Sequence, residues 1–183
     1  MNVLVAHFRA MARNNAWSNH RLHQACAQLS AADYTAKRTS FFPTIQWTLD
    51  HILVVDRLYL DALEGRPKSI EAYDDDLRLD FADLRAAQGV EDRRLMAFCD
   101  ALTTEGLSDE ATLLRQDGPK RDTVSAILPH LFVHQIHHRG QVHAMLAGTA
   151  VAPPQLDELF LTEDIERRRE DFAALGWPLE PRA

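Results

Sequence analysis

The stretch FVHQIHHRGQVH (Phe132–His143) holds four of the nine histidines in this chain of 183 residues. A fifth, His130, lies two residues before it. Apolar residues recur here at intervals of three and four, which predicts a helix from about Thr123 to Leu146. Asp122 or Thr123 is expected as its N-cap, and Gly148 as its stop. The face on which these histidines lie therefore decides how the chain is interpreted.

The same periodicity predicts three further long helices and one short C-terminal helix. Their expected ranges are Val3–Leu29, Pro43–Leu63 and Phe81–Leu102, with the short helix within Leu156–Leu175. Before the last long helix, the tripeptide DGP at Asp117 marks a turn, which predicts a small hairpin or an irregular loop. The sequence thus predicts an all-α protein, a four-helix bundle in which residues 1–183 form one domain.

The composition excludes several classes of protein. The net charge is −7, and the basic residues do not cluster into a stripe, which argues against a surface for nucleic acid or an anionic membrane. No apolar run approaches the ~18 residues of a membrane span, and the charged N-terminus does not resemble a signal peptide. The two cysteines, Cys26 and Cys99, are too far apart for a CxxC motif. We expect a cytoplasmic protein.

Helical geometry predicts that two of the clustered histidines face the core. With about 100° per residue, His138 falls inside the arc formed by the Ile, Leu, Val and Met side chains, and His134 lies on its edge. His130 and His137 lie further out on the same side, and His143 lies on the opposite face. Two inward histidines at positions i and i+4 can hold one metal ion, or they can be hydrogen-bonded core residues.

A metal site needs a ligand from a second helix, and His51 is the candidate. It is the only histidine between Pro43 and Leu63, and it shares the inward arc of that helix. The predicted ligands are therefore His51, His134 and His138. His130 is the alternative ligand or a supporting residue. His20 and His23 are expected on a solvated face.

The pattern differs from two common metal motifs. The stretch HQIHH has Gln135 where the zinc protease motif HExxH has its general base. The helix also lacks any acidic residue between Thr123 and Gly148, so a di-iron carboxylate site is excluded. Three neutral imidazoles leave a coordination position free, which is typical of catalytic rather than structural metal sites.

Neighbouring residues also suggest roles. Gln141 is expected to orient a ligand ring by a hydrogen bond, and Arg139 to pair with an acidic residue of another helix. Gly140 in mid-helix suggests a close helix contact or ligand approach. Trp17 and Trp47 are expected to anchor the core.

Three blocks of the sequence resemble the hallmarks of the DinB (DinB/YfiT-like) family. They are ARNNAWSNHRLHQACAQLSAADY, FFPTIQWTLDHILVVDRLYLDALEG and HLFVHQIHHRGQVHAMLAG. The resemblance implies a four-helix bundle in which a divalent metal ion, usually nickel or zinc, is held by His51, His134 and His138. It also implies a homodimer. Relatives include transferases and isomerases that use low-molecular-weight thiols such as bacillithiol or mycothiol.

Three functions are compatible with these observations. The first is a metal-dependent transferase or hydrolase that acts on a small molecule by activating a thiol or water. The second is a metal-binding, stress-responsive protein without turnover. The third is a structural bundle whose histidines respond to pH.

Overall fold

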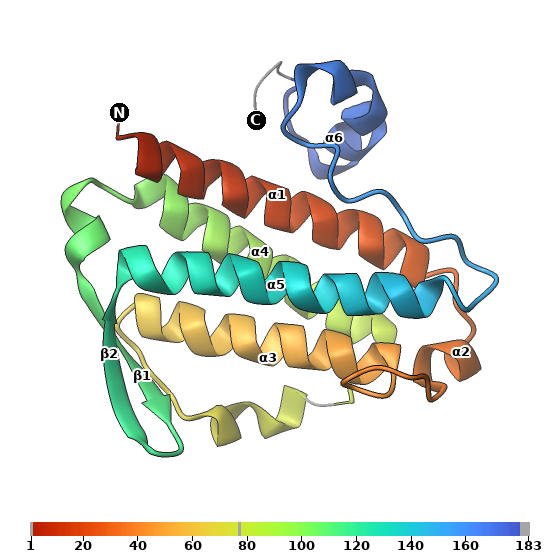
Figure 1. Cartoon of the computed structure of the whole chain (residues 1–183), viewed down its shortest axis with the longest axis horizontal. Helices are drawn as coiled ribbons and strands as arrows, with labels where there is room; N and C mark the ends of the chain where they lie inside the picture. The colour runs from red at the N-terminus through yellow and green to blue at the C-terminus, as the bar shows by residue number, and fades with distance from the viewer. Residues whose placement is uncertain (1, 77, 180–183) are drawn as a thin grey trace.

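The computed structural model describes residues 2–76 and 78–179. Its four long helices are α1 (Val3–Cys26), α3 (Ile45–Leu63), α4 (Phe81–Ala101) and α5 (Val124–Leu146). Helix α1 packs against α4 and α5, and α3 packs against the same two helices (Figure 1). These four contacts close a ring around a shared interior. The predicted four-helix bundle is therefore confirmed.

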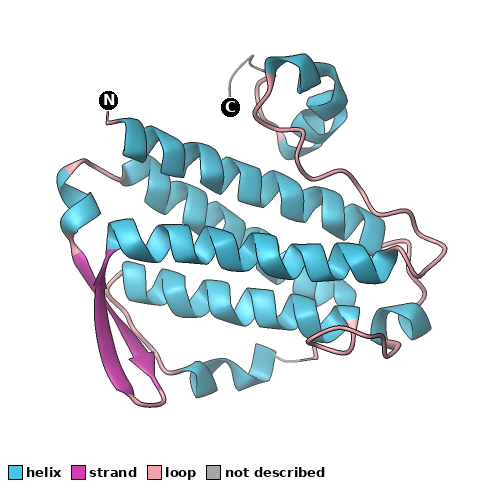
Figure 2. Cartoon of the chain, viewed as in Figure 1, coloured by secondary structure: helices cyan, strands magenta, loops and turns pink. Residues whose placement is uncertain are grey.

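The shorter elements lie at the periphery of the bundle (Figure 2). They are α2 (Ala31–Thr35), η1 (Ile70–Asp76), η2 (Glu105–Ser108), β1 (Glu110–Arg115), β2 (Gly118–Thr123), η3 (Thr162–Arg168) and α6 (Arg169–Leu175). Strands β1 and β2 form an antiparallel hairpin in which Glu110 pairs with Thr123. Of the two predicted alternatives for this segment, the hairpin is therefore the one observed. No helix in the described part of the chain is long and apolar enough to cross a membrane.

Local capping explains where the helices begin and end. The side chain of Thr44 accepts a hydrogen bond from the backbone N–H of Trp47 (3.0 Å), so α3 begins two residues after the predicted Pro43. Asp80 caps α4 in the same way through Asp83 (3.1 Å). Gly65, with φ +74°, follows the C-terminal end of α3 and supplies the left-handed conformation that turns the chain away.

The two largest apolar clusters of the core lie on either side of a polar layer. Helix α1 contributes Phe8 and Ala12 to one cluster and Leu22 and Cys26 to the other. The segments of all four helices between these clusters carry buried polar residues: Asn15, Asn19, Asp56, Gln88, Asp92, Gln135 and Arg139. Because buried polar groups need hydrogen-bond partners, this layer constrains how the four helices align.

The two tryptophans expected in the core differ in their environments. Trp17 is 0% exposed, packs against Phe172, and donates from Nε1 to Asp171 Oδ2 at 3.1 Å. This confirms Trp17 as a core anchor, and it attaches the C-terminal segment to α1. The same prediction for Trp47 is wrong: its side chain is 52% exposed and lies against Phe42. It belongs to the first turn of α3, on the solvent side.

Gly140 does not lie at a close helix contact. A Cβ added to this residue meets no heavy atom within 4 Å, so the expected close helix contact is wrong, whereas the alternative expectation of ligand approach stays a prediction.

We therefore expect Gly140→Ala to raise the free energy of unfolding by about 0.5–1 kcal/mol, because alanine loses less backbone entropy in a helix. Urea denaturation would measure the change. Gly65→Ala is the matched control and should destabilise the protein, because the backbone at Gly65 has positive φ. A loss of stability in Gly140→Ala would contradict the open environment of this position.

Candidate metal centre

The packing of α3 against α5 brings His51, His134 and His138 together. Each offers one ring nitrogen, and these three nitrogens lie within 4.8 Å of one another. Nε2 of His51 is 3.0 Å from Nε2 of His134, and the ring centroids of His134 and His138 are 4.4 Å apart. The residues predicted to form a metal site thus form one cluster.

The other histidines lie outside this cluster. His130 is exposed, with its ring against Tyr59 at a centroid distance of 5.4 Å. His143 donates from Nε2 to the carbonyl of Pro154 (3.1 Å) on the opposite side of α5. On α1, His20 is half-buried and His23 is 5% exposed, so the predicted solvated face is wrong for His23.

Gln141 orients one of the clustered rings. Its Oε1 accepts a hydrogen bond from Nδ1 of His138 at 2.8 Å, and its Nε2 donates to His137 at 3.2 Å. With its proton on Nδ1, His138 presents an unprotonated Nε2. A hydrogen bond of this kind sets the tautomer and direction of a metal-ligating histidine.

Burial keeps the clustered imidazoles neutral. It lowers the pKa of His51 to about 4 and that of His134 to about 3, and the neighbouring imidazoles contribute in the same direction. Burial also lowers the pKa of His138. Nδ1 of His134 is buried and has no hydrogen-bond partner among the described residues. Three neutral rings with converging nitrogens are a donor set that fits a divalent zinc or nickel ion.

Phe42 covers one side of the cluster. Its ring centroid lies 4.5 Å from that of His51 and 5.7 Å from that of His138. Sequence reasoning missed this residue because Phe42 precedes α3 in a loop, where no helical periodicity indicates its direction. An apolar ring beside the nitrogens lowers the local polarity, which strengthens electrostatic interactions there.

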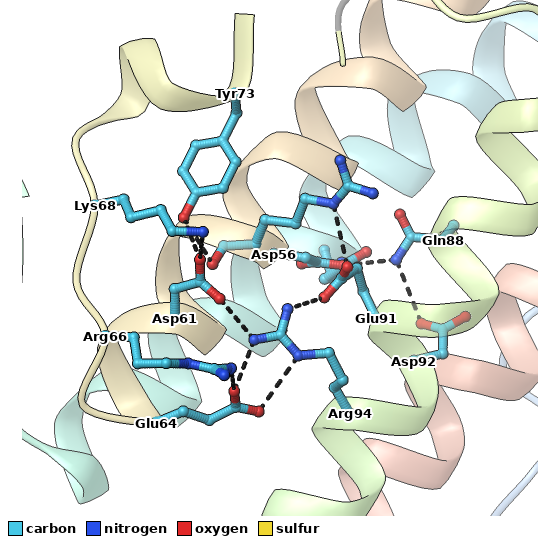
Figure 3. A network of polar contacts seen from close by, with 12 residues as sticks. Asp56, Asp61, Glu64, Arg66, Lys68, Tyr73, Gln88, Glu91, Asp92 and Arg94 are labelled. Carbon is cyan, nitrogen blue, oxygen red and sulfur yellow. Dashed lines mark hydrogen bonds and ion pairs between the residues drawn. The ribbon is translucent and has the colours of Figure 1, made fainter. Parts of the chain in front are cut away.

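The polar layer lies behind the cluster and involves the residue next to His134. Gln135 donates from Nε2 to Oδ2 of Asp56, and Gln88 donates to the same oxygen at 2.7 Å. Gln88 also reaches Asp92 Oδ1 at 3.4 Å (Figure 3). Gln135 therefore links α5 to α3 and, through Asp56, to α4.

Arg139 occupies the same layer. Its Nη1 donates to Oδ1 of Asn15, to Oδ1 of Asn19 (3.1 Å) and to Oε1 of Gln135 (3.1 Å). Within the described part of the chain it makes no direct ion pair, so the expected pairing with an acidic residue is wrong. Amide side chains instead separate this guanidinium from Asp92 and Asp56.

A second network holds α3, which carries His51, against α4. Arg94 donates to Asp61 (2.6 Å), Glu91 (2.6 Å) and Glu64 (2.8 Å), and Asp61 also accepts from Tyr73 (2.8 Å) (Figure 3). Burial opposes ionisation of Asp61, but hydrogen bonds from Arg94, Lys68 and Tyr73 outweigh it and lower its pKa to about 2. Asp61 therefore stays ionised at neutral pH.

The polar layer predicts a specific pH dependence. Burial, with the charge of Asp92, raises the pKa of Asp56 to about 7 against the opposing hydrogen bonds from Gln88 and Gln135. The unfolded chain loses this proton near pH ~4, so the contribution of Asp56 to the free energy of unfolding falls as the pH rises from ~4 to ~7.

Asp56→Asn should remove this slope, because an amide does not ionise and its oxygen can accept the same two hydrogen bonds. Relative to the wild type, the variant should gain at least about 1 kcal/mol of stability between pH 5 and pH 8. Chemical denaturation at the two pH values measures the difference. Parallel pH profiles for the two proteins would show that Asp56 is not a protonated buried acid.

An all-helical bundle with three converging imidazoles on two adjacent helices defines a class of candidate metal-binding proteins. The profile of the DinB family matches residues 1–170, and the chain belongs to this family. It is 26% identical over 159 residues to Protein DinB of Bacillus subtilis (strain 168), covering 81% of this chain and 91% of that protein. The uncharacterized protein YizA of the same organism is 25% identical over 133 residues, covering 70% and 79% respectively.

A solved structure agrees on the fold. The crystal structure of a DinB-like protein, YjoA, from Bacillus subtilis superposes with a TM-score of 0.53. The match covers 84% of this chain and 97% of that chain, at 20% sequence identity. The family and the fold are therefore both as the sequence predicts.

Proposed function

We propose that this protein binds one divalent metal ion, nickel or zinc, through His51, His134 and His138, and uses it as a metal-dependent transferase or hydrolase. The observation that carries the proposal is the convergence of three neutral imidazoles, of which His138 is oriented by Gln141. Family membership is compatible with metal binding.

The donor set favours an open site. The cluster in the described residues contains three histidines and no cysteine or carboxylate, whereas structural zinc sites have four protein ligands. A divalent ion in such a site supplies Lewis acidity that lowers the pKa of a coordinated water or thiol. His51, His134 and His138 would hold the ion, and Phe42 would restrict access of water from one side.

The absence of a carboxylate from this cluster also bears on the reaction. A thiol that loses its proton on binding needs no separate general base, so a low-molecular-weight thiol is the expected cosubstrate. The same absence supports a second candidate function, a metal-binding stress-responsive protein without turnover. We further expect the protein to be a homodimer, which native mass spectrometry would measure.

Turnover by the metal-loaded protein separates these two functions. The protein would be incubated with bacillithiol or mycothiol and a panel of small electrophiles, and loss of the free thiol followed over time. Thiol consumption that requires the metal and is lost in His51→Ala supports the enzyme. Full metal occupancy without turnover would favour the non-catalytic function.

Replacing Gln141 tests how the site is oriented. Gln141→Leu removes the acceptor for Nδ1 of His138, and loss of such a partner lowers metal affinity by about 10- to 100-fold. Competition with a chromophoric chelator would measure the dissociation constant. Gln28→Leu, an exposed change on another segment, is the control. Unchanged affinity in Gln141→Leu would mean that this hydrogen bond does not position the ring.

A further inference from the structure

A cavity lies between α1, α4 and the C-terminal segment, and the histidine cluster does not line it. Its volume is about 270 Å³. Polar side chains line it from two helices, namely His20 and His23 of α1 and Arg85, Asp92 and Arg93 of α4. Met96, Leu175 and Trp177 are among the residues that add apolar surface.

His23 is the more deeply buried of the two buried polar side chains that line this cavity, the other being Asp92. Its side chain is 5% exposed, and its ring meets Phe81 edge-on at a centroid distance of 5.9 Å. Within residues 2–76 and 78–179 its ring nitrogens have no hydrogen-bond partner. Neither ring nitrogen is among the side-chain atoms that are fully shut off from solvent, so a ligand in the cavity that His23 lines can form a hydrogen bond with this ring.

Arg85 and Arg93 give the cavity its charge. They lie two turns apart on one face of α4, with Gly89 between them, and both side chains are exposed. Neither guanidinium forms an ion pair with a described residue, although the chain carries a net charge of −7. Guanidinium groups are suited to carboxylate and phosphate, so two that line one cavity can together bind an oxyanion.

The other titratable groups at the cavity do not cancel this charge. Burial, followed by the charges of Arg85 and Arg139, lowers the pKa of His23 to about 3, so this ring is a neutral hydrogen-bond donor. His20 accepts from Gln24 (2.8 Å) and is 3.9 Å from Asp171, which is itself paired with Arg21. Asp92 is the one carboxylate among the lining residues, and its Oδ1 accepts hydrogen bonds from Asn15 and Asn19.

We infer that this cavity is a second ligand site, which takes a small organic oxyanion. Arg85 and Arg93 bind the phosphate or carboxylate group, His23 donates a hydrogen bond to it, and Trp177 and Met96 contact its apolar body. The site is separate from the proposed metal centre and does not depend on it.

Titration of the full-length, metal-loaded protein with phenyl phosphate, benzoate and neutral benzamide tests the inference. We expect the two anions to bind and benzamide not to bind, with NMR shifts at the indole N–H of Trp177 and the ring of His23. Preference between phenyl phosphate and benzoate would identify the oxyanion. Binding of benzamide as strong as that of the anions would overturn the inference.

Three variants locate the binding site. Arg85→Gln/Arg93→Gln should weaken anion binding at least about tenfold, whereas Arg121→Gln, an exposed change on the hairpin, should leave it unchanged. His134→Ala should also leave it unchanged, which separates this cavity from the histidine cluster. Equal binding in the double variant, or loss of binding in His134→Ala, would contradict the inference.

Discussion

Replacing His134 with alanine should lower the metal affinity of this protein by more than about 100-fold, because loss of even an outer hydrogen-bond partner costs 10- to 100-fold. The ring centroid of His134 is 4.9 Å from that of His51 and 4.4 Å from that of His138, and its Nε2 is 3.0 Å from Nε2 of His51. The two remaining imidazoles hold the ion less tightly than three, so the bound ion should exchange readily with free ions in solution. Competition with a chelator, followed by metal analysis of the dialysed protein, measures the loss.

The same helix provides the control for this experiment. His130→Ala removes an exposed imidazole one turn away, and it should leave metal affinity unchanged. If a folded His134→Ala protein retained its metal, His134 would not be a ligand of the site. A large loss of metal affinity in His130→Ala would mean that His130 is a ligand, although the structure places it outside the cluster.

Arg139→Met should destabilise the bundle strongly, with a loss of about 3–5 kcal/mol in the free energy of unfolding, because each buried hydrogen-bonding group left without a partner costs about 1–3 kcal/mol. Arg139 is 4% exposed, and its Nη1 donates hydrogen bonds to three amide oxygens on two helices. Its removal leaves those oxygens unsatisfied, and it leaves Asp56 and Asp92 buried without a nearby cation. Urea denaturation at pH 7 measures the change.

The hairpin supplies the comparison for this prediction. Arg121→Met makes the same chemical change at a side chain that is 70% exposed, and it should alter stability by less than about 1 kcal/mol. If the two variants lost similar amounts, the polar layer would not be a structural element of the bundle. Retained helical content with loss of cooperative unfolding would identify the layer as the source of specific packing.

Periodicity carried most of the successful sequence predictions. The four long helices, the turn between β1 and β2, and the shared inward stripe of His134 and His138 all follow from local patterns. His51 could be assigned because it is the only histidine of its helix and shares an arc with apolar residues. Its distance from His134 required the packing of α3 on α5, which the resemblance to the DinB family implied and local pattern alone could not give.

Residues whose environment depends on distant segments were harder to predict. His23 follows a polar stretch and looked solvated, but it is 5% exposed and its ring packs against Phe81 of α4. Trp47 looked like a core residue because of its size, yet it lies on the outer side of the first turn of α3. Phe42 covers the histidines from a loop, where the sequence contains no signal of direction.

Metal analysis of the untagged, purified protein tests the central claim most directly. The three histidines predict about one nickel or zinc ion per chain, and His51→Ala should abolish it because the open site then keeps too few ligands. A wild-type protein without bound metal after incubation with either ion would contradict the claim. So would an ion retained undiminished by the His51 variant.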